Sequence, residues 1–154
     1  MRKTYTVQGY FLDTNIWVAA TFPEHIGHIQ AVKFLSNRDH QSPAWLSPHI
    51  CISWMRLIST RSTCLIYSSP AYSNQDAQEV LKKWLSQPEI QYMEKEPDGT
   101  FEKWKQLSSS PFPSPKIWMD AYIAAIAIEA DLPLVTFDKG FQAYAEQGLQ
   151  LFEI

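Results

Sequence analysis

The stretch IWMDAYIAAIAIEADLPLVTFD, residues 117–138, decides the fold. Its first half repeats apolar residues, many of them alanine, at the spacing of one helix face, and alanine allows close packing. After a short turn, Leu134-Val135 is apolar without alternation, as in a strand that is covered on both faces. The stretch therefore predicts a helix, a turn and a buried strand, with Asp120 near the helix start and Asp138 just past the strand.

A third aspartate has the same setting near the other end of the chain. The apolar run Tyr10-Phe-Leu ends at Asp13, and Thr14-Asn15 then leads into the apolar Ile16-Trp-Val. We expect a central strand that stops at Asp13 and turns into a helix. A single acid beside a helix start or a turn has an ordinary structural explanation. Three acids at one edge of a covered parallel sheet lie where α/β proteins place ligand chemistry, and this coincidence favours a site.

Length and composition indicate one folded domain over residues 1–154. Hydrophobic residues make up 45% of the 154 residues and aromatic residues 14%, which disfavours disorder. The formal net charge of −3 gives no overall attraction to nucleic acid, so contact with phosphate requires a local patch or a metal. No apolar run reaches membrane-spanning length, and residues 1–8 do not resemble a secretory signal, so we expect a cytoplasmic protein without membrane contact.

Strand and helix patterns alternate along the rest of the chain, which predicts an α/β fold with a parallel sheet between helical layers. The breaks between them are Pro23, the polar turn 37–42 and the Ser/Pro loop 108–115. The predicted strands are 10–13, 45–46, 90–93, 134–135 and 149–152. The first predicted helix spans 24–35 and turns one apolar stripe inward: Ile26, Ile29, Val32 and Leu35. The other predicted helices are one from Pro48 after a Ser47 cap, one from a Ser73 cap to near Pro88, one capped by Thr100, the helix that bears Asp120, and 139–147. Residues 64–72 are expected to be irregular.

Two other residue pairs deserve comparison with metal sites. His25 and His28 lie one helical turn apart, but no third ligand is nearby, and surface or packing roles are the expectation. Cys51 and Cys64 match neither a metal spacing nor a disulfide framework, so we expect buried thiols.

Three carboxylates brought together without a cation repel one another, and burial makes the repulsion worse. Such a cluster fits a hard divalent cation, and all-oxygen ligands favour Mg²⁺ or Mn²⁺ over zinc. An ion of this kind keeps water and binds phosphate oxygens, which suits hydrolysis of phosphodiesters. It also supplies the positive charge that the acidic chain lacks.

Three motifs resemble those of PIN-domain ribonucleases, most closely the VapC-type toxins of toxin–antitoxin pairs. They are Phe11-Leu-Asp13-Thr-Asn15, Asp120-Ala-Tyr-Ile-Ala-Ala125 and Val135-Thr-Phe-Asp138-Lys-Gly-Phe141. The resemblance spans nearly the whole chain. It implies a three-layer α/β/α sandwich, Mg²⁺-dependent (or Mn²⁺-dependent) endonucleolytic RNA cleavage, a homodimer and a small antitoxin that blocks the site.

By this resemblance the carboxylate ligands and catalytic residues are Asp13, Asp120 and Asp138. Asn15 and Thr136 would hydrogen-bond to these ligands and hold them in place without binding the metal themselves. Basic residues that are candidates for substrate contact are Arg56 and Lys139.

The chain departs from the family pattern at one position. Many members carry a glutamate on the helix that begins here at Pro48, but no Asp or Glu occurs between Asp39 and Asp76. His49, Ser53, a water molecule or Asp98 are the candidates to fill the gap. The departure motivates an alternative, an attenuated RNA- or antitoxin-binding module on the same fold.

Two further alternatives concern the reaction. A phosphatase with Asp13 as covalent nucleophile would need an acid two residues later, where the chain has Asn15. A DNA substrate is also compatible with carboxylate-bound Mg²⁺, because the ion alone does not distinguish the sugars.

Overall fold

A parallel sheet of five short strands lies at the centre of the molecule, in the order β3-β2-β1-β4-β5. The computed structural model describes residues 8–154, so Met1–Val7, most of the segment compared with a secretory signal, lie outside the described residues. The strands are β1 (Tyr10–Leu12), β2 (Ala44–Leu46), β3 (Ile90–Tyr92), β4 (Leu134–Val135) and β5 (Leu151–Phe152).

The strand order reverses beside β1. The chain adds β2 and then β3 on one side of β1, and later adds β4 and β5 on the other. Leu12 pairs with Val135, and the Asp13 N–H extends this ladder by donating to the Val135 carbonyl at 3.0 Å. The segments that leave β1 and β4 therefore start side by side, at the point of a parallel sheet where ligands bind most often.

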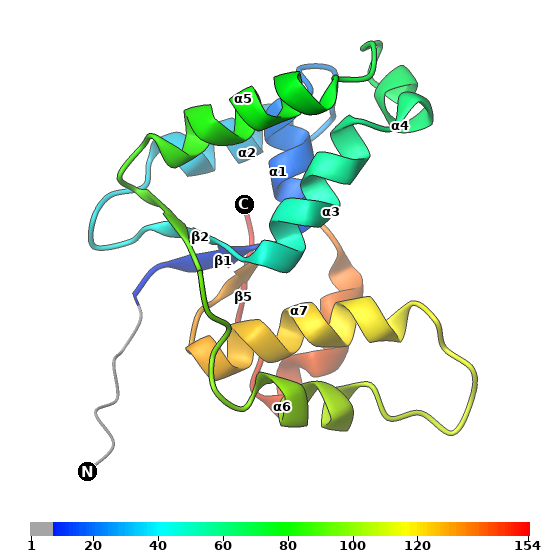
Figure 1. Ribbon diagram of the computed structural model, residues 1–154. Coiled ribbons are helices and arrows are strands. Elements are labelled where there is room, and N and C mark those ends of the chain that lie inside the picture. Colours follow the sequence, from blue (N-terminus) through cyan, green and yellow to red (C-terminus); the bar gives the residue numbers. More distant parts are fainter. Residues whose placement is uncertain (1–7) are drawn as a thin grey trace.

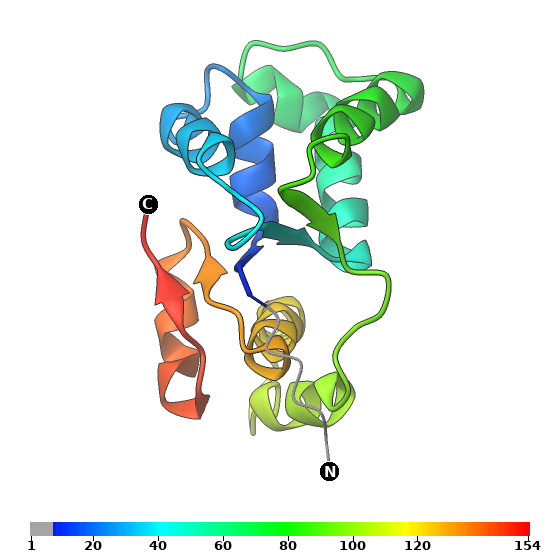
Figure 2. The ribbon, with the colours of Figure 1, turned by 90° about the vertical axis from the view of Figure 1, so that its left-hand side faces the viewer.

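Helices cover both faces of the sheet, which confirms the predicted three-layer α/β/α architecture. Figure 1 shows one helical layer above the sheet and another below it, and Figure 2 shows the same layers from the side. The upper layer holds α1 (Thr14–Thr21), α2 (His28–Ser36), α3 (Pro48–Ile58), α4 (Arg61–Ile66) and α5 (Asn74–Leu85). The lower layer holds α6 (Thr100–Leu107), α7 (Ile117–Ala130) and the 3₁₀ helix η1 (Lys139–Gln147).

The lower layer is built on α7. Its alanines are small enough to let the helix lie close to both the sheet and α6, and most of its residues beyond Asp120 are buried. A left-handed Asp131 ends the helix, and Pro133 precedes β4. The predicted helix, turn and strand of this stretch are confirmed.

Tryptophans fill the upper core. Trp17 of α1 and Trp54 of α3 are fully buried and stack with ring centroids 5.1 Å apart. The Trp54 indole N–H donates to the Thr21 hydroxyl at 2.9 Å, which satisfies one of the polar atoms in this layer. The Ser47 and Ser73 caps are also as predicted, since each side chain accepts from a backbone N–H in the first turn of its helix.

The predicted helix 24–35 begins four residues late. Residues 24–27 form a turn in which the Gly27 N–H donates to His25 Nδ1 at 2.9 Å, and α2 starts at His28. The expected inward stripe is therefore wrong at Ile26 and Ile29, whose side chains are 96% and 78% exposed. The residues that α2 buries are Ala31, Phe34 and Leu35.

Two smaller expectations are also wrong. Residues 64–66 belong to α4, in the segment predicted to be irregular. Thr100 is the first residue of α6 and not its cap: Gly99 caps the helix in a left-handed conformation (φ +90°), and the Thr100 hydroxyl donates to Pro97. Within residues 8–154, no helix has both the length and the apolar character needed to cross a membrane.

Candidate active site

Asp13 lies directly after β1 and caps α1. It is 6% exposed, its Oδ1 accepts from the Thr14 N–H at 2.7 Å and its Oδ2 accepts from the Thr136 hydroxyl at 2.7 Å. The second contact joins the segments after β1 and β4, which the strand order makes neighbours. Asp13 is therefore a buried carboxylate at the switch point of the sheet.

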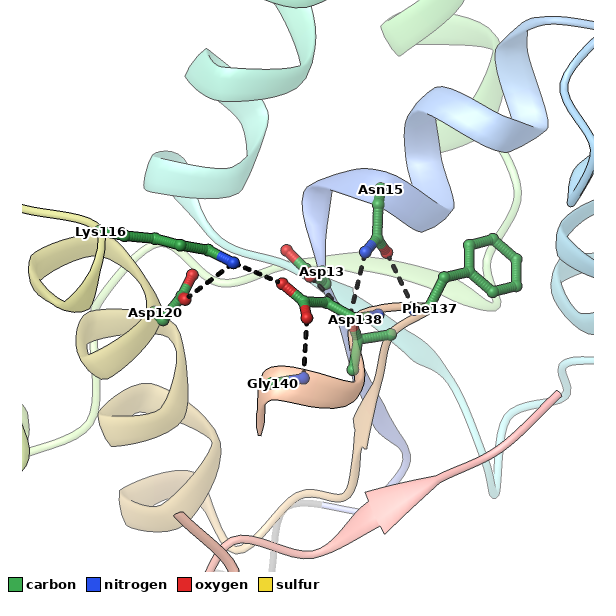
Figure 3. Close-up of polar contacts among 8 residues, drawn as sticks. Asp13, Asn15, Lys116, Asp120, Phe137, Asp138 and Gly140 are labelled. Carbon is green, nitrogen blue, oxygen red and sulfur yellow. Dashed lines mark hydrogen bonds and ion pairs between the residues drawn. The ribbon is translucent and has the colours of Figure 1, made fainter. Parts of the chain in front are cut away.

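Asn15 and Thr136 form the framework behind this carboxylate (Figure 3). The Asn15 side-chain NH₂ donates to Thr136 Oγ1 at 3.1 Å, and its carbonyl oxygen accepts from the Phe137 N–H at 3.3 Å. Thr136 Oγ1 also accepts from the Asp138 N–H at 3.0 Å. Each polar atom of Asn15 thus fixes the β4–η1 turn, and an acid at position 15, as a haloacid-type phosphatase would need, could not donate to Thr136.

Asp120 and Asp138 face one another across a lysine. Lys116, just before α7, places its Nζ 3.4 Å from Asp138 Oδ2 and 3.9 Å from Asp120 Oδ2. Figure 3 shows both carboxylates directed toward this ammonium group, with Asp13 beside Asp138. The other Asp138 oxygen accepts from the Gly140 N–H at 2.8 Å and so caps η1. An ammonium group between two carboxylates marks the position that a cation would take.

Burial and mutual repulsion change the proton affinity of two of the three acids. The pKa of Asp13 is raised from 3.8 to about 6, mainly by burial and further by the charges of Asp120 and Asp138, against the opposing hydrogen bonds from Thr136 and Thr14. Burial also raises the pKa of Asp120, Lys116 opposes this rise, and Asp138 adds to it. The negative charges therefore interact across the site, and the cluster is electrostatically unfavourable without a cation.

The donor set fits a hard divalent ion only in part. Across residues 8–154, no group of three or more His, Cys, Asp or Glu side chains is close enough together to enclose one ion. Mg²⁺, however, is commonly held by one or two carboxylates and completes its shell with water and substrate phosphate. Asp120 and Asp138, which already share one cationic group, fit that demand, and Asp13 lies beside them as a charged neighbour.

Lys116 was not anticipated from the sequence. Its only sequence signal is the i, i+4 spacing to Asp120, which is common on exposed helix faces. The contact with Asp138 spans 22 positions along the chain and depends on how the Ser/Pro loop delivers α7 to the sheet.

The two basic residues proposed for substrate contact lie on different surfaces. Lys139 follows Asp138 and lines a cavity of about 260 Å³ between the β4–η1 turn and β5. Arg56 lies in the last turn of α3 and lines a separate groove of about 510 Å³ between α3 and α5, together with Ile52 and Ala77. Among the described residues neither forms an ion pair with the three aspartates, although Asp138 lines the same cavity as Lys139, and their role in substrate binding stays a prediction.

The three residues considered as replacements for the missing fourth acid have different surroundings in the structure. Asp98 is almost fully exposed and pairs with Lys95 at 3.3 Å, so it does not reach the aspartates. His49, near the start of α3, packs edge-on against Tyr122 with ring centroids 5.0 Å apart, and Tyr122 donates to Glu96. Burial lowers the pKa of His49, and its Nε2 is buried without a partner among the described residues. Ser53 is half-buried on α3.

The histidine pair has local roles. His25 Nδ1 accepts from Gly27, and its ring lies 4.9 Å from the Tyr67 ring and 6.2 Å from the Phe137 ring. His28 Nδ1 bonds the Ala19 carbonyl at 2.8 Å. The Nδ1 atom of each histidine is thus engaged with the backbone, in the 24–27 turn for His25 and on α1 for His28, in line with the expected packing role.

Known proteins are similar to this chain in sequence and in fold. The family model for the PIN domain matches residues 10–147. Ribonuclease VapC41 from two Mycobacterium tuberculosis strains is 33% identical over 150 residues, which cover 90% of this chain and 95% of the relative.

Two solved structures are also similar. Mycobacterium tuberculosis VapC20, a sarcin-ricin loop cleaving toxin, matches with a TM-score of 0.63 at 17% identity, over 92% of this chain and 96% of that chain. Rickettsia felis VapBC2, bound to a DNA fragment from its promoter, matches with a TM-score of 0.60 at 16% identity, over 94% of this chain and 97% of that chain. At these identities the two structures establish a shared fold, whereas the PIN-domain match and the VapC41 relative show that this chain belongs to the PIN-domain family, in its VapC-type branch.

Proposed function

We propose that this protein is an endoribonuclease that depends on Mg²⁺ or Mn²⁺ and acts as the toxin of a toxin–antitoxin pair in the cytoplasm. Membership of the VapC-type branch and the relative named ribonuclease support RNA as the substrate. The observation that carries the metal dependence is the shared ammonium contact of Asp120 and Asp138, next to the buried and charge-coupled Asp13.

In this proposal Asp120 and Asp138 hold the ion and Asp13 adds negative charge beside it. The ion, when bound, lowers the pKa of a water nucleophile and stabilises negative charge on the phosphate and the leaving oxygen. Thr136 and Asn15 keep the Asp13 carboxylate and the β4–η1 turn in place. Lys116, whose side chain is 75% exposed, is free to swing away from the carboxylates and to meet a phosphate oxygen.

We further propose two protein partners, a cognate small antitoxin and a second copy of this chain. The VapBC2 neighbour supports the first, since its fold is shared along nearly the whole length. Exposed apolar side chains such as Ile26 and Ile52 provide surface for either contact.

The test is cleavage of a panel of labelled structured and single-stranded RNAs by the purified protein. We expect cleavage with Mg²⁺ or Mn²⁺, none with EDTA, and a loss of at least about 100-fold for Asp120→Asn. Asp98→Asn, which replaces an exposed aspartate away from the site, is the matched control and should leave the rate unchanged. An intact RNA panel at high protein and metal concentration, with DNA equally intact, would reject the nuclease proposal.

The absent fourth acid and the lack, among residues 8–154, of three ligands that enclose one ion favour one second candidate, a module that binds RNA or its antitoxin without cleaving. It predicts that RNA binds wild type and Asp120→Asn equally well and that neither cuts it. Cleavage by wild type alone excludes this candidate.

A further inference from the structure

Exposed aromatic side chains gather where α6 and α7 meet. The rings of Phe101 and Trp104 stack with centroids 5.7 Å apart, and Trp104 lies 5.5 Å from Trp118 of α7. The Trp104 indole N–H donates to the Trp118 carbonyl at 2.9 Å, which fixes the middle ring. Phe101 and Trp118 nevertheless remain 62% and 54% exposed. More than half of the surface of each end residue of this row is therefore open to solvent.

A pocket of about 440 Å³ lies at the Trp118 end of the row. The Ser/Pro loop between α6 and α7 forms its other wall, where Phe112 is 75% exposed. Hydroxyl groups and one cation complete the lining: Ser108, Ser109, Ser110, Ser114 and Lys105. The Lys105 ammonium lies 4.8 Å from the centre of the Phe101 ring and is held there by Glu102 at 2.9 Å.

This chemistry fits a nucleobase better than an apolar protein segment. The volume is that of a small-molecule site, and two exposed aromatic rings offer stacking surfaces. The serine hydroxyls of the loop can meet the polar edge of a base, although Ser108, Ser110 and Ser114 already bond within the loop and to α6. The lining residues include Lys105, whose ammonium can meet a phosphate that flanks the base by exchanging its exposed partner Glu102.

The pocket and the candidate active site lie on either side of the start of α7. Pro115 and Trp118 line the pocket, and Lys116 between them contacts Asp120 and Asp138. Trp118 and Asp120 lie on opposite sides of the first turns of α7, about 10 Å apart across a helix diameter. A strand whose phosphate meets the aspartates can therefore pass the start of α7 and bring a base a few nucleotides away into the pocket.

We propose that Trp118 and Phe112 form a base-stacking subsite that holds an unpaired nucleotide of the RNA substrate a few positions away from the scissile phosphate. The inference rests on the proposed ribonuclease function, because it names how that substrate is held. Lys105 contributes charge at the rim of the subsite, and Trp104 positions Trp118.

The experiment first maps the cleavage site in an RNA that wild type cuts, and then uses short oligoribonucleotides around it, each with one abasic position. Trp118→Ala and Phe112→Ala are compared with Trp118→Phe, which keeps a ring, and with Leu65→Ala, a control for loss of an exposed apolar side chain on α4. Phe112 lies in an exposed loop, so its variant folds even if Trp118→Ala disturbs Trp104.

The subsite predicts a rise in KM of about 5- to 150-fold for both alanine variants, since base–aromatic stacking contributes about 1–3 kcal/mol per base. The kcat should not change, because stacking holds substrate and transition state alike. An abasic residue at one position should raise the wild-type KM by the same factor and should have no further effect on Trp118→Ala. Trp118→Phe should retain most of the affinity.

Wild-type KM in both alanine variants, or sensitivity to the same abasic position in variant and wild type, overturns the proposal. So does loss of dimer mass or of antitoxin inhibition with an unchanged KM, since the aromatic row would then be a protein interface. If wild type cuts no RNA, the proposed function fails by itself. The subsite is then tested by fluorescence anisotropy of Asp120→Asn with a labelled random RNA 12-mer and with its fully abasic counterpart. Tighter binding of the RNA that carries bases, lost when Trp118→Ala is added, supports the subsite. Equal binding of the two RNAs overturns it.

Discussion

Replacing Asp13 by asparagine should stabilise the metal-free protein at neutral pH. The pKa of Asp13 is about 6 in the folded state, against 3.8 for an aspartate side chain in the unfolded chain, a difference of about two pH units. At about 1.4 kcal/mol per unit, the charged carboxylate destabilises the folded state by about 3 kcal/mol. A raised pKa means that the folded state binds the proton more tightly. The associated stability is therefore fully present below pH 4 and is lost as the pH rises through about 6.

Asparagine removes the charge but keeps an oxygen for the Thr14 N–H. Its NH₂ group meets a Thr136 oxygen that already accepts from Asn15 and Asp138, so the variant loses the hydrogen bond from Thr136 by the same amount at every pH. The difference in unfolding free energy between Asp13→Asn and wild type should therefore grow, in favour of the variant, by up to about 3 kcal/mol between pH 4 and pH 7. Acids outside the site titrate equally in both proteins and cancel in the difference.

The assay is urea unfolding of both proteins in EDTA at pH 4, 5, 6 and 7, followed by the same series with Mg²⁺. Asp98→Asn serves as the control, and its profile should run parallel to that of wild type. Magnesium should raise the stability of wild type more than that of Asp13→Asn, because an ion that binds only the folded state stabilises it by mass action. Parallel pH profiles for wild type and Asp13→Asn in EDTA would refute the claim that the charged Asp13 carboxylate destabilises the folded state. Equal stabilisation of both by Mg²⁺ would remove Asp13 from the ion site.

Three further changes probe the surroundings of the site. Lys116→Met removes the ammonium group that competes with a metal between the two carboxylates, so calorimetric titration should show Mg²⁺ binding several-fold tighter; weaker binding would mean that the lysine does not stand in the ion's place. Thr136→Val removes the hydroxyl that donates to Asp13 and should lower the unfolding free energy by about 1–3 kcal/mol, whereas Thr136→Ser should restore it. Gly27→Ala places a Cβ 2.6 Å from the Phe137 ring and should cost about 1–3 kcal/mol in thermal unfolding, and an unchanged melting temperature would show that the ring is free to move.

The strands and the site edge could be predicted because their signals are local. A buried strand followed by an acid, at Leu12-Asp13 and again at Val135 to Asp138, needs only the apolar run and its end. Parallel pairing then brings the ends together whatever the loops do, since the order of strands follows from short right-handed connections. The three aspartates could be assigned to one edge without knowledge of any long-range contact.

The helix after Pro23 shows where such reasoning fails. Ile26 and Ile29 have the spacing of an inward stripe, but the stripe assumes that the helix has already begun. Buried Gly27, its bond to His25 and its close approach to Phe137 hold a turn there, and these are tertiary contacts. The same limit applies to Lys116, whose contact with Asp138 depends on the path of a Ser/Pro loop.

The structural and functional explanations of the three aspartates prove to be compatible. Asp13 caps α1, Asp138 caps η1, and Asp120 lies in the first turn of α7. Each carboxylate therefore has an ordinary local role, as composition and spacing alone would suggest. Three helix starts that meet at one edge also surround the cluster with positive dipole ends and free N–H groups, which oppose the repulsion among the acids. A site with this compensation needs less positive charge from an ion than three acids without it would.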